Sequence, residues 1–236
     1  MAQHYGAKIP TGTIFSFDAL SQKCYSGSGT TFKDAITGTT ATATVTTSLA
    51  MDSTLGSPHL KFTPGATTRT AYMAFNSSNI NVPRGVTATW SCWCYFQDQG
   101  SIDHPMFGWE TGSSWVGENG VVCGTGWGTD GVRFGVAGYN TGGYSGMVGN
   151  TWVHWVITFN GNQTNGLKLY KNASIERQGT PTTTTIGTSN TNTFNIGATN
   201  SRGGNWGGYL DIVQVWDREL TANEVGTLYS VQKGRF

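Results

Sequence analysis

The feature that most constrains this chain is a strict two-residue alternation of side-chain character in several separate segments. Every odd-numbered residue from 153 to 159 is large and apolar, while the even positions are His154, Val156 and Thr158. Alternation of this period predicts half-buried β-strands rather than helices. The segments that share the pattern, each bounded by turn residues, predict strands over residues 13–19, 71–76, 87–97, 132–137, 153–160, 167–171, 193–196 and 208–216.

One segment near the end predicts a short helix. Thr221 stands three residues before Glu224, the spacing at which each side chain bonds to the other residue's backbone N–H at a helix start. The strands run from near residue 13 to near residue 216 without a linker or a repeat. We therefore expect one domain over residues 1–236, with residues 1–12 as a short N-terminal arm.

The surface of this chain must be polar without being strongly charged. Lys plus Arg number 14 and Asp plus Glu 13, so the net charge is +1 and only 11% of residues are charged. This balance argues against nucleic-acid binding through a basic surface. The sequence has no run of 18 apolar residues, so it predicts no membrane span. The first six residues lack the pattern of a signal peptide, so we expect synthesis in the cytoplasm.

The four cysteines are expected to be reduced thiols. Cys92 and Cys94 lie two residues apart in a predicted strand, on one face but separated along it, which is a poor geometry for a disulfide. Zinc, the alternative, would need a Cys-x-x-Cys or histidine spacing that the sequence lacks. The remaining two cysteines are Cys24 and Cys123.

Three stretches resemble the laminin-G-like, concanavalin A-type jelly roll. Residues 152–161 and 167–173 are similar to its Trp-x-His-hydrophobic strand and Leu-Tyr-x-Asn-Gly strand, with Ala173 in place of the closing glycine. Residues 194–197 are similar to a later strand. Residues 207–225 are similar to the ending, a Gly-aromatic-hydrophobic-Asp strand followed by Arg-x-Leu-Thr-x-x-Glu and a short helix.

This resemblance implies an all-β fold, a two-sheet antiparallel jelly-roll sandwich (laminin-G/concanavalin A-like) with one short C-terminal helix. It also implies that strand 208–216 pairs near strand 13–19, which would bring the two ends of the chain together. Alternation along residues 209–215 predicts that Tyr209, Asp211 and Val213 share one face, with apolar residues on both faces.

Both ends of the chain resemble jelly-roll proteins of tailed-phage virions. Residues 15–19 and 24–34 are similar to the opening of those proteins, and residues 228–236, which finish Lys-Gly-Arg-Phe, are similar to their ending. The resemblance implies a virion protein, most simply a capsid decoration or else a tail or fibre component. Its partners would be other virion proteins and further copies of itself, and no nucleic acid or membrane.

No catalytic set is evident in the sequence. Retaining glucanases with this sandwich carry Glu-x-Asp-x-Glu on one strand, and this chain has neither that run nor Gly-x-Ser-x-Gly. We therefore expect no enzyme activity. We predict no cofactor and no metal site, although related domains hold calcium at the sandwich rim and Asp130 is the best candidate for it. The Asp130-Gly131 pair is also an ordinary turn sequence.

Aromatic residues in glycine-rich loops are the candidate binding residues. Such rings stack on the apolar faces of sugars while Asn and Asp bond the hydroxyl groups. They also anchor loops or protein interfaces, and the sequence leaves these alternatives open. The first hypothesis is a non-enzymatic structural protein on a virion surface, and the alternative is a lectin-like module that recognises a host-surface glycan. Under either hypothesis the candidate residues are Trp115, Trp127, Asp130, Tyr139, Tyr144, Asn205 and Trp206.

Overall fold

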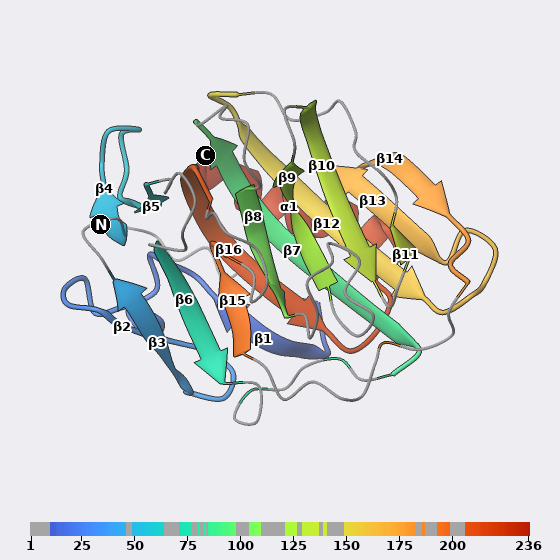
Figure 1. The fold of residues 1–236 in the computed structure, drawn as a ribbon, viewed down its shortest axis with the longest axis horizontal. Coiled ribbons are helices and arrows are strands. Elements are labelled where there is room, and N and C mark those ends of the chain that lie inside the picture. The colour runs from blue at the N-terminus through green and yellow to red at the C-terminus, as the bar shows by residue number, and fades with distance from the viewer. Residues whose placement is uncertain are drawn as a thin grey trace.

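The fold is a sandwich of two antiparallel β-sheets, with one helix on the outer side of the first sheet (Figure 1). The predicted mostly-β architecture with a C-terminal helix is confirmed. The computed structural model describes residues 10–45, 49–63, 71–76, 80, 83, 85–97, 104–109, 121–126, 129–136, 139–140, 149–182, 186, 193–198 and 206–236.

The first sheet has the strand order β14-β13-β12-β7-β16-β5-β4, and β1 also pairs with β16. Each of its strand pairs is antiparallel. Its strands are β1 (Thr13–Phe17), β4 (Leu49–Asp52), β5 (His59–Phe62), β7 (Thr87–Phe96), β12 (Trp152–Asn160), β13 (Leu167–Lys171), β14 (Ser174–Gly179) and β16 (Gly208–Trp216).

The second sheet has the strand order β11-β10-β9-β8-β15-β6-β3-β2, again antiparallel throughout. The strands are β2 (Thr31–Lys33), β3 (Thr40–Val45), β6 (Ala71–Asn76), β8 (His104–Trp109), β9 (Val121–Gly126), β10 (Thr129–Val136), β11 (Tyr139–Asn140) and β15 (Thr193–Ile196). The chain ends in α1 (Ala222–Gln232) and the 3₁₀ turn η1 (Lys233–Arg235).

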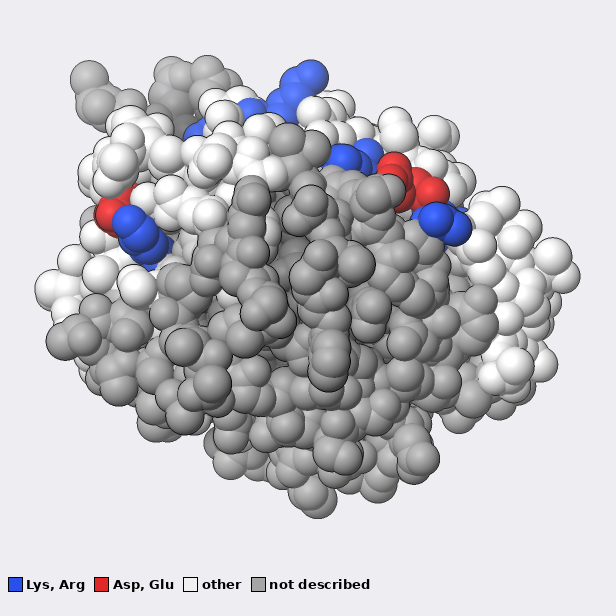
Figure 2. All heavy atoms as spheres, turned by 45° about the horizontal axis from the view of Figure 1, so that its top comes forward, with Lys and Arg blue, Asp and Glu red and all other residues white. Residues whose placement is uncertain are grey.

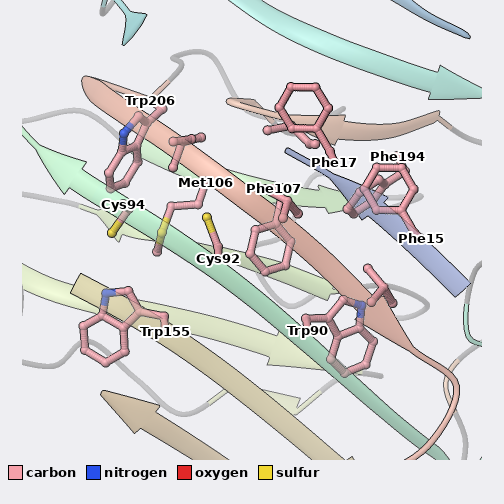
Figure 3. Close-up of a cluster of buried hydrophobic side chains, with 14 of the residues drawn as sticks. Phe15, Phe17, Trp90, Cys92, Cys94, Met106, Phe107, Trp155, Phe194 and Trp206 are labelled. Carbon is pink, nitrogen blue, oxygen red and sulfur yellow. The ribbon is translucent and has the colours of Figure 1, made fainter. Parts of the chain in front are cut away.

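The main hydrophobic core fills the space between the two sheets (Figure 3). Phe15 of β1 makes edge-to-face contacts with Phe75 and Phe194 of the second sheet, each with 5.0 Å between ring centroids. Full burial of one such side chain contributes about 1.5–3 kcal/mol. These contacts join the first strand of one sheet to the middle of the other.

Alternation along β7 is as the sequence predicts. Trp90, Cys92 and Cys94 belong to the core between the sheets, whereas Trp93 points to the outer face. There the Trp93 Nε1–H donates to the Gln232 side-chain oxygen at 2.7 Å, which ties α1 to the sheet. Because Cys92 and Cys94 share one face and form no disulfide, their predicted thiol state is consistent with the structure.

The prediction for β16 is right about burial and wrong about faces. All nine residues of β16 are buried. However, Asp211 lies opposite Trp93 and Gln214 lies opposite Ser91, so three steps on β16 match two on β7. This bulge, with Ile212 at φ 45°, shifts the alternation, and the core residues of the strand are Leu210, Val213 and Val215.

The two ends of the chain meet as the resemblance implies. β1 pairs antiparallel with β16, with Phe15 opposite Val215. The capping box is also confirmed, because Glu224 N–H donates to Thr221 Oγ1 and Thr221 N–H donates to a Glu224 carboxylate oxygen. The helix is longer than the predicted turn and continues to Gln232. With 11 residues it is too short to cross a bilayer, and no other described helix could do so.

Candidate functional site

The structure places three of the seven predicted site residues. Asp130 lies in β10 and Tyr139 in β11, which pair at one edge of the second sheet. Their side chains are outside the description, so their assignment as glycan-binding or interface residues stays a prediction, as does the expectation that Asp130, the best calcium candidate, holds no metal. Within the described part of the chain, no group of three or more His, Cys, Asp and Glu residues could hold a metal ion. Outside the described residues lie Trp115, Trp127, Tyr144 and Asn205.

Trp206, the third placed residue, is fully buried, with an exposed fraction of 0%. Its indole N–H donates to the Tyr209 carbonyl oxygen at 3.1 Å, and its ring lies 5.3 Å from that of Phe96. Figure 3 shows it among the core side chains near Cys94 and Met106. A ring without an accessible face offers nothing to a sugar, so the structure favours the anchoring alternative for Trp206.

The described surface also has a hollow of about 400 Å³ that the sequence analysis does not predict. It lies where the segment after β1 meets the β4–β5 hairpin. We call it the Tyr25 hollow. It is lined by Ala19, Leu20, Gln22, Tyr25, Ser26, Gly27, Met51, Ser53 and Pro58.

A compact turn at the end of β1 forms the first wall of the Tyr25 hollow. Asp18 accepts the Leu20 N–H at 2.9 Å through its carboxylate, and the Tyr25 N–H bonds to the Ser21 carbonyl at 2.8 Å. Cys24 points into the protein, and burial raises the pKa of its thiol to about 11. A thiol that stays neutral at pH 7 acts here as packing rather than as a nucleophile.

Tyr25 is held in position from two sides. Its ring stacks on Phe32 of β2, with 4.8 Å between centroids and 16° between planes. Its hydroxyl donates to the Gly29 carbonyl at 3.1 Å, and Gly29 has φ 77°, a left-handed conformation that favours glycine. The ring is therefore oriented before any ligand arrives, which reduces the entropy cost of binding.

A buried carboxylate secures the base of this segment. Asp34 is inaccessible to solvent and accepts hydrogen bonds from the Ser16 N–H at 2.8 Å and from the N–H and hydroxyl of Thr37 at 2.9 and 2.7 Å. The Ile36 N–H adds a fourth bond at 3.2 Å. These bonds fix β1 relative to the turn after β2, so the segment between them has little freedom to shift.

The β4–β5 hairpin forms the second wall. Asp52 accepts the Thr54 N–H at 2.7 Å and the Tyr209 hydroxyl at 3.1 Å, and its other oxygen lies 3.3 Å from Lys61 Nζ. The bonds from Thr54 hold the pKa of the Asp52 carboxyl well below its usual range. The carboxylate is therefore charged at neutral pH and keeps the hairpin tied to β16.

The lining of the Tyr25 hollow is uncharged and amphipathic. Leucine, tyrosine, methionine and proline side chains supply apolar surface, and one glutamine and two serines supply donors and acceptors. A sugar ring needs this combination, because it has an apolar face and a rim of hydroxyl groups. On the molecular face in Figure 2 the described charged residues lie in small groups, some of both signs and one, near the top, of Lys and Arg alone.

A smaller hollow of about 140 Å³ adjoins the first one. It shares Gln22, Tyr25 and Ser26 with the Tyr25 hollow and adds the cations Lys23 and Lys33. Tyr25 lines both hollows. Tyr25 is followed by Ser26, Gly27, Ser28 and Gly29, so the criterion of an aromatic residue in a glycine-rich loop could have found it, although it is not among the predicted site residues.

A family model described as the concanavalin A-like lectin/glucanases superfamily matches residues 66–226. All the residues that line the Tyr25 hollow come before the matched residues. A search of curated proteins found no match.

Three solved structures share the fold. Trypanosoma rangeli sialidase in complex with sialic acid has a TM-score of 0.62 and 16% identity, covering 95% of this chain and 34% of the sialidase chain. Domain 4 of an extracellular arabinanase from Geobacillus stearothermophilus, in complex with arabinotriose, has a TM-score of 0.60 and 14% identity, over 92% of this chain and 98% of that domain. The ligand-binding domain of botulinum neurotoxin serotype D, in complex with N-acetylneuraminic acid, has a TM-score of 0.58 and 11% identity, over 94% and 51% of the two chains.

The chain thus spans about a third of the length of the sialidase it resembles. At these identities the likeness to the solved structures concerns the fold alone.

Proposed function

Because this chain belongs to the concanavalin A-like lectin/glucanase superfamily, we propose that it is a lectin-like domain that binds a glycan in the Tyr25 hollow. The observation that carries the proposal is the hollow itself, in which a fixed tyrosine ring stands among uncharged amide and hydroxyl groups. The sugar ligands of the arabinanase domain and of the neurotoxin domain support the same class of ligand.

The geometry suggests how a sugar is held. One apolar face of the ring packs on Tyr25 and Leu20, while its hydroxyl groups bond to Gln22, Ser26 and Ser53. Leu20 is 38% exposed, which is more than a core leucine shows and leaves apolar surface for contact. A volume of about 400 Å³ is at the lower end of typical small-ligand sites and suits about one or two sugar rings.

The test begins with a glycan array and continues with calorimetry on the best ligand. Tyr25→Ala removes the stacking surface and is expected to lower affinity at least tenfold, or about 1.4 kcal/mol. Tyr25→Phe keeps the ring and should bind nearly as well as the unchanged protein. Gln22→Ala changes an exposed side chain without threatening the fold, and it should also weaken binding.

The matched control is Ile175→Ala. Ile175 is 50% exposed on β14, which forms the outer edge of the first sheet. The substitution removes an apolar side chain that lies outside the hollow, so it should leave glycan affinity unchanged. If no glycan binds, or if Tyr25→Ala and Gln22→Ala bind as well as Ile175→Ala does, the proposed site is refuted.

A virion structural role is the second candidate, and one observation favours it. The two end motifs that resemble phage proteins contact each other, because the Arg235 guanidinium bonds to both carboxylate oxygens of Asp18 at 2.8 and 2.9 Å. The two segments on which the resemblance rests therefore lie side by side in the fold. Counting copies of the chain per purified particle tests this role, since a shell component would be present in hundreds of copies and a tail or fibre in far fewer.

A further inference from the structure

Two polar side chains from one segment and a third from a distant part of the chain form a hydrogen-bonded series beside the Tyr25 hollow. The Ser57 Oγ lies 2.8 Å from His59 Nε2, and His59 Nδ1 lies 3.1 Å from Asp211 Oδ2. Ser57 precedes β5 and His59 begins it, whereas Asp211 lies in the bulge of β16. The sequence hides this series, because 152 positions separate His59 from Asp211.

Solvent access differs among the three in a way that suits nucleophilic chemistry. Ser57 is partly exposed, while His59 and Asp211 are 1% and 0% exposed. A nucleophile must reach its substrate, whereas the base and the residue that orients it can be buried. Exposure to solvent therefore decreases along the hydrogen-bonded series, from Ser57 to His59 to Asp211.

Asp211 is held as an orienting carboxylate. Its Oδ1 accepts the backbone N–H groups of Ile212 at 2.9 Å and Ala19 at 3.4 Å, and Arg235 approaches Oδ2 at 3.5 Å. These donors compensate the buried charge. A carboxylate facing Nδ1 favours the tautomer with a proton on Nδ1, which leaves Nε2 as an acceptor for the Ser57 hydroxyl.

The His59 ring is fixed by aromatic neighbours. Its centroid lies 4.7 Å from Trp152, 5.7 Å from Phe236 and 6.4 Å from Tyr209. These rings and the two hydrogen bonds leave the imidazole one orientation. A base held in this way needs no rearrangement before it accepts a proton.

We propose that Ser57 is a nucleophile for acyl transfer from esters, with His59 as its general base and Asp211 as the positioning residue for His59. Ser57 Oγ forms a bond to the ester carbonyl carbon as its proton passes to His59 Nε2. The bond from that carbon to the alcohol oxygen breaks, and the alcohol leaves with the proton from Nε2. Water then adds to the acyl carbon as one of its protons passes to His59 Nε2, the bond to Ser57 Oγ breaks as that proton returns to Oγ, and the acid is released.

The adjoining hollow indicates the substrate class. Pro58 follows Ser57 directly and lines the hollow together with Met51 and Ser53 of the same hairpin. A small acyl ester of a hydroxyl-bearing compound would place its ester at Ser57 and its alcohol part in the hollow. The nucleophile itself does not depend on glycan binding, because an activated ester needs no occupied hollow.

The experiment uses the full chain, a fluorophosphonate probe and p-nitrophenyl acetate. Mass spectrometry of the folded protein should show the phosphonyl group on Ser57, and ester hydrolysis should disappear in Ser57→Ala. Ser174→Ala is the matched control, because Ser174 is an exposed serine of β14 that lines neither hollow, and it should keep both reactions. His59→Gln should slow labelling roughly 100-fold, the usual contribution of a general base.

Thermal unfolding of each variant separates loss of chemistry from loss of fold, and Ser57→Ala is the variant least able to disturb packing. Absence of the probe from Ser57 in the folded wild-type chain overturns the proposal. So does equal labelling of folded His59→Gln, because Ser57 would then react without its base. Labelling is measured without glycan and glycan affinity is measured without the probe, so failure of the binding site and failure of the nucleophile are distinguished.

Discussion

His154 should make this protein lose stability between pH 7 and pH 5. The side chain is fully buried on the outer face of β12, where Nε2 lies 2.7 Å from Ser91 Oγ and the ring stacks 4.8 Å from Trp93. Its Nδ1 has no hydrogen-bond partner in the described structure. Burial lowers the pKa of His154 from 6.5 to about 3.

The sign and size follow from proton linkage. Below pH 6.5 the unfolded chain binds a proton at His154, whereas the folded protein does so only near pH 3. The stability contributed by the neutral histidine is therefore fully present above pH 6.5 and is lost as the pH falls toward 3, at about 1.4 kcal/mol per pH unit. From pH 7 to pH 5 the loss is about 2 kcal/mol, or about 4–8 °C in Tm for a chain of this length.

The assay is thermal unfolding, followed by circular dichroism, of the wild-type chain and His154→Gln at pH 7 and pH 5. The variant keeps an acceptor for Ser91 but has no proton to bind in this range, so its Tm should fall less by about that amount. The hydrogen bond to Arg218 lowers the pKa of Glu224 to about 2, so stopping at pH 5 limits the contribution of Glu224 to the loss of stability. Equal losses in the two proteins would refute the reasoning.

Three further predictions concern stability and thiol chemistry. Thiol titration should give about four groups after denaturation, while the folded protein should react slowly, because Cys24 is buried and the pKa of its thiol is raised to about 11. Truncation after Asn205 removes β16 and should abolish cooperative unfolding, whereas Thr221→Ala removes one cap and should cost about 1 kcal/mol. Gly208→Ala should lower the free energy of unfolding several times more than Thr221→Ala, because its Cβ would lie 2.1 Å from the Tyr95 carbonyl oxygen. Gly226→Ala in α1 meets open space and should raise the free energy of unfolding by about 0.5–1 kcal/mol in chemical denaturation.

The long central strands could be predicted because a local pattern determines them. In β12 successive side chains point alternately to the core between the sheets and to the face covered by α1, as the sequence predicts. The bulge in β16 has no local signal, since it accompanies the contacts that Asp211 makes with His59 and Ala19. Alternation alone therefore assigned that strand correctly and its faces incorrectly.

The candidate site was harder to predict because tertiary contacts create it. Tyr25 stood out in the sequence only as part of an end motif, and its hollow forms where the β4–β5 hairpin comes against it. Trp206 was predicted as a site residue but is buried, because a glycine-rich sequence around an aromatic residue does not reveal whether the ring is exposed. Local composition identified loop aromatics in general, and burial shows that a ligand cannot reach the ring of Trp206.

The most direct test of glycan binding at the Tyr25 hollow is an NMR titration of the ¹⁵N-labelled protein with the best ligand from the array. If the glycan binds there, the largest amide shifts fall in residues 19–27 and 51–59, the two walls of the hollow. Shifts confined to the β10–β11 edge, where Asp130 and Tyr139 lie, would contradict binding at the Tyr25 hollow and would support the site residues predicted from the sequence.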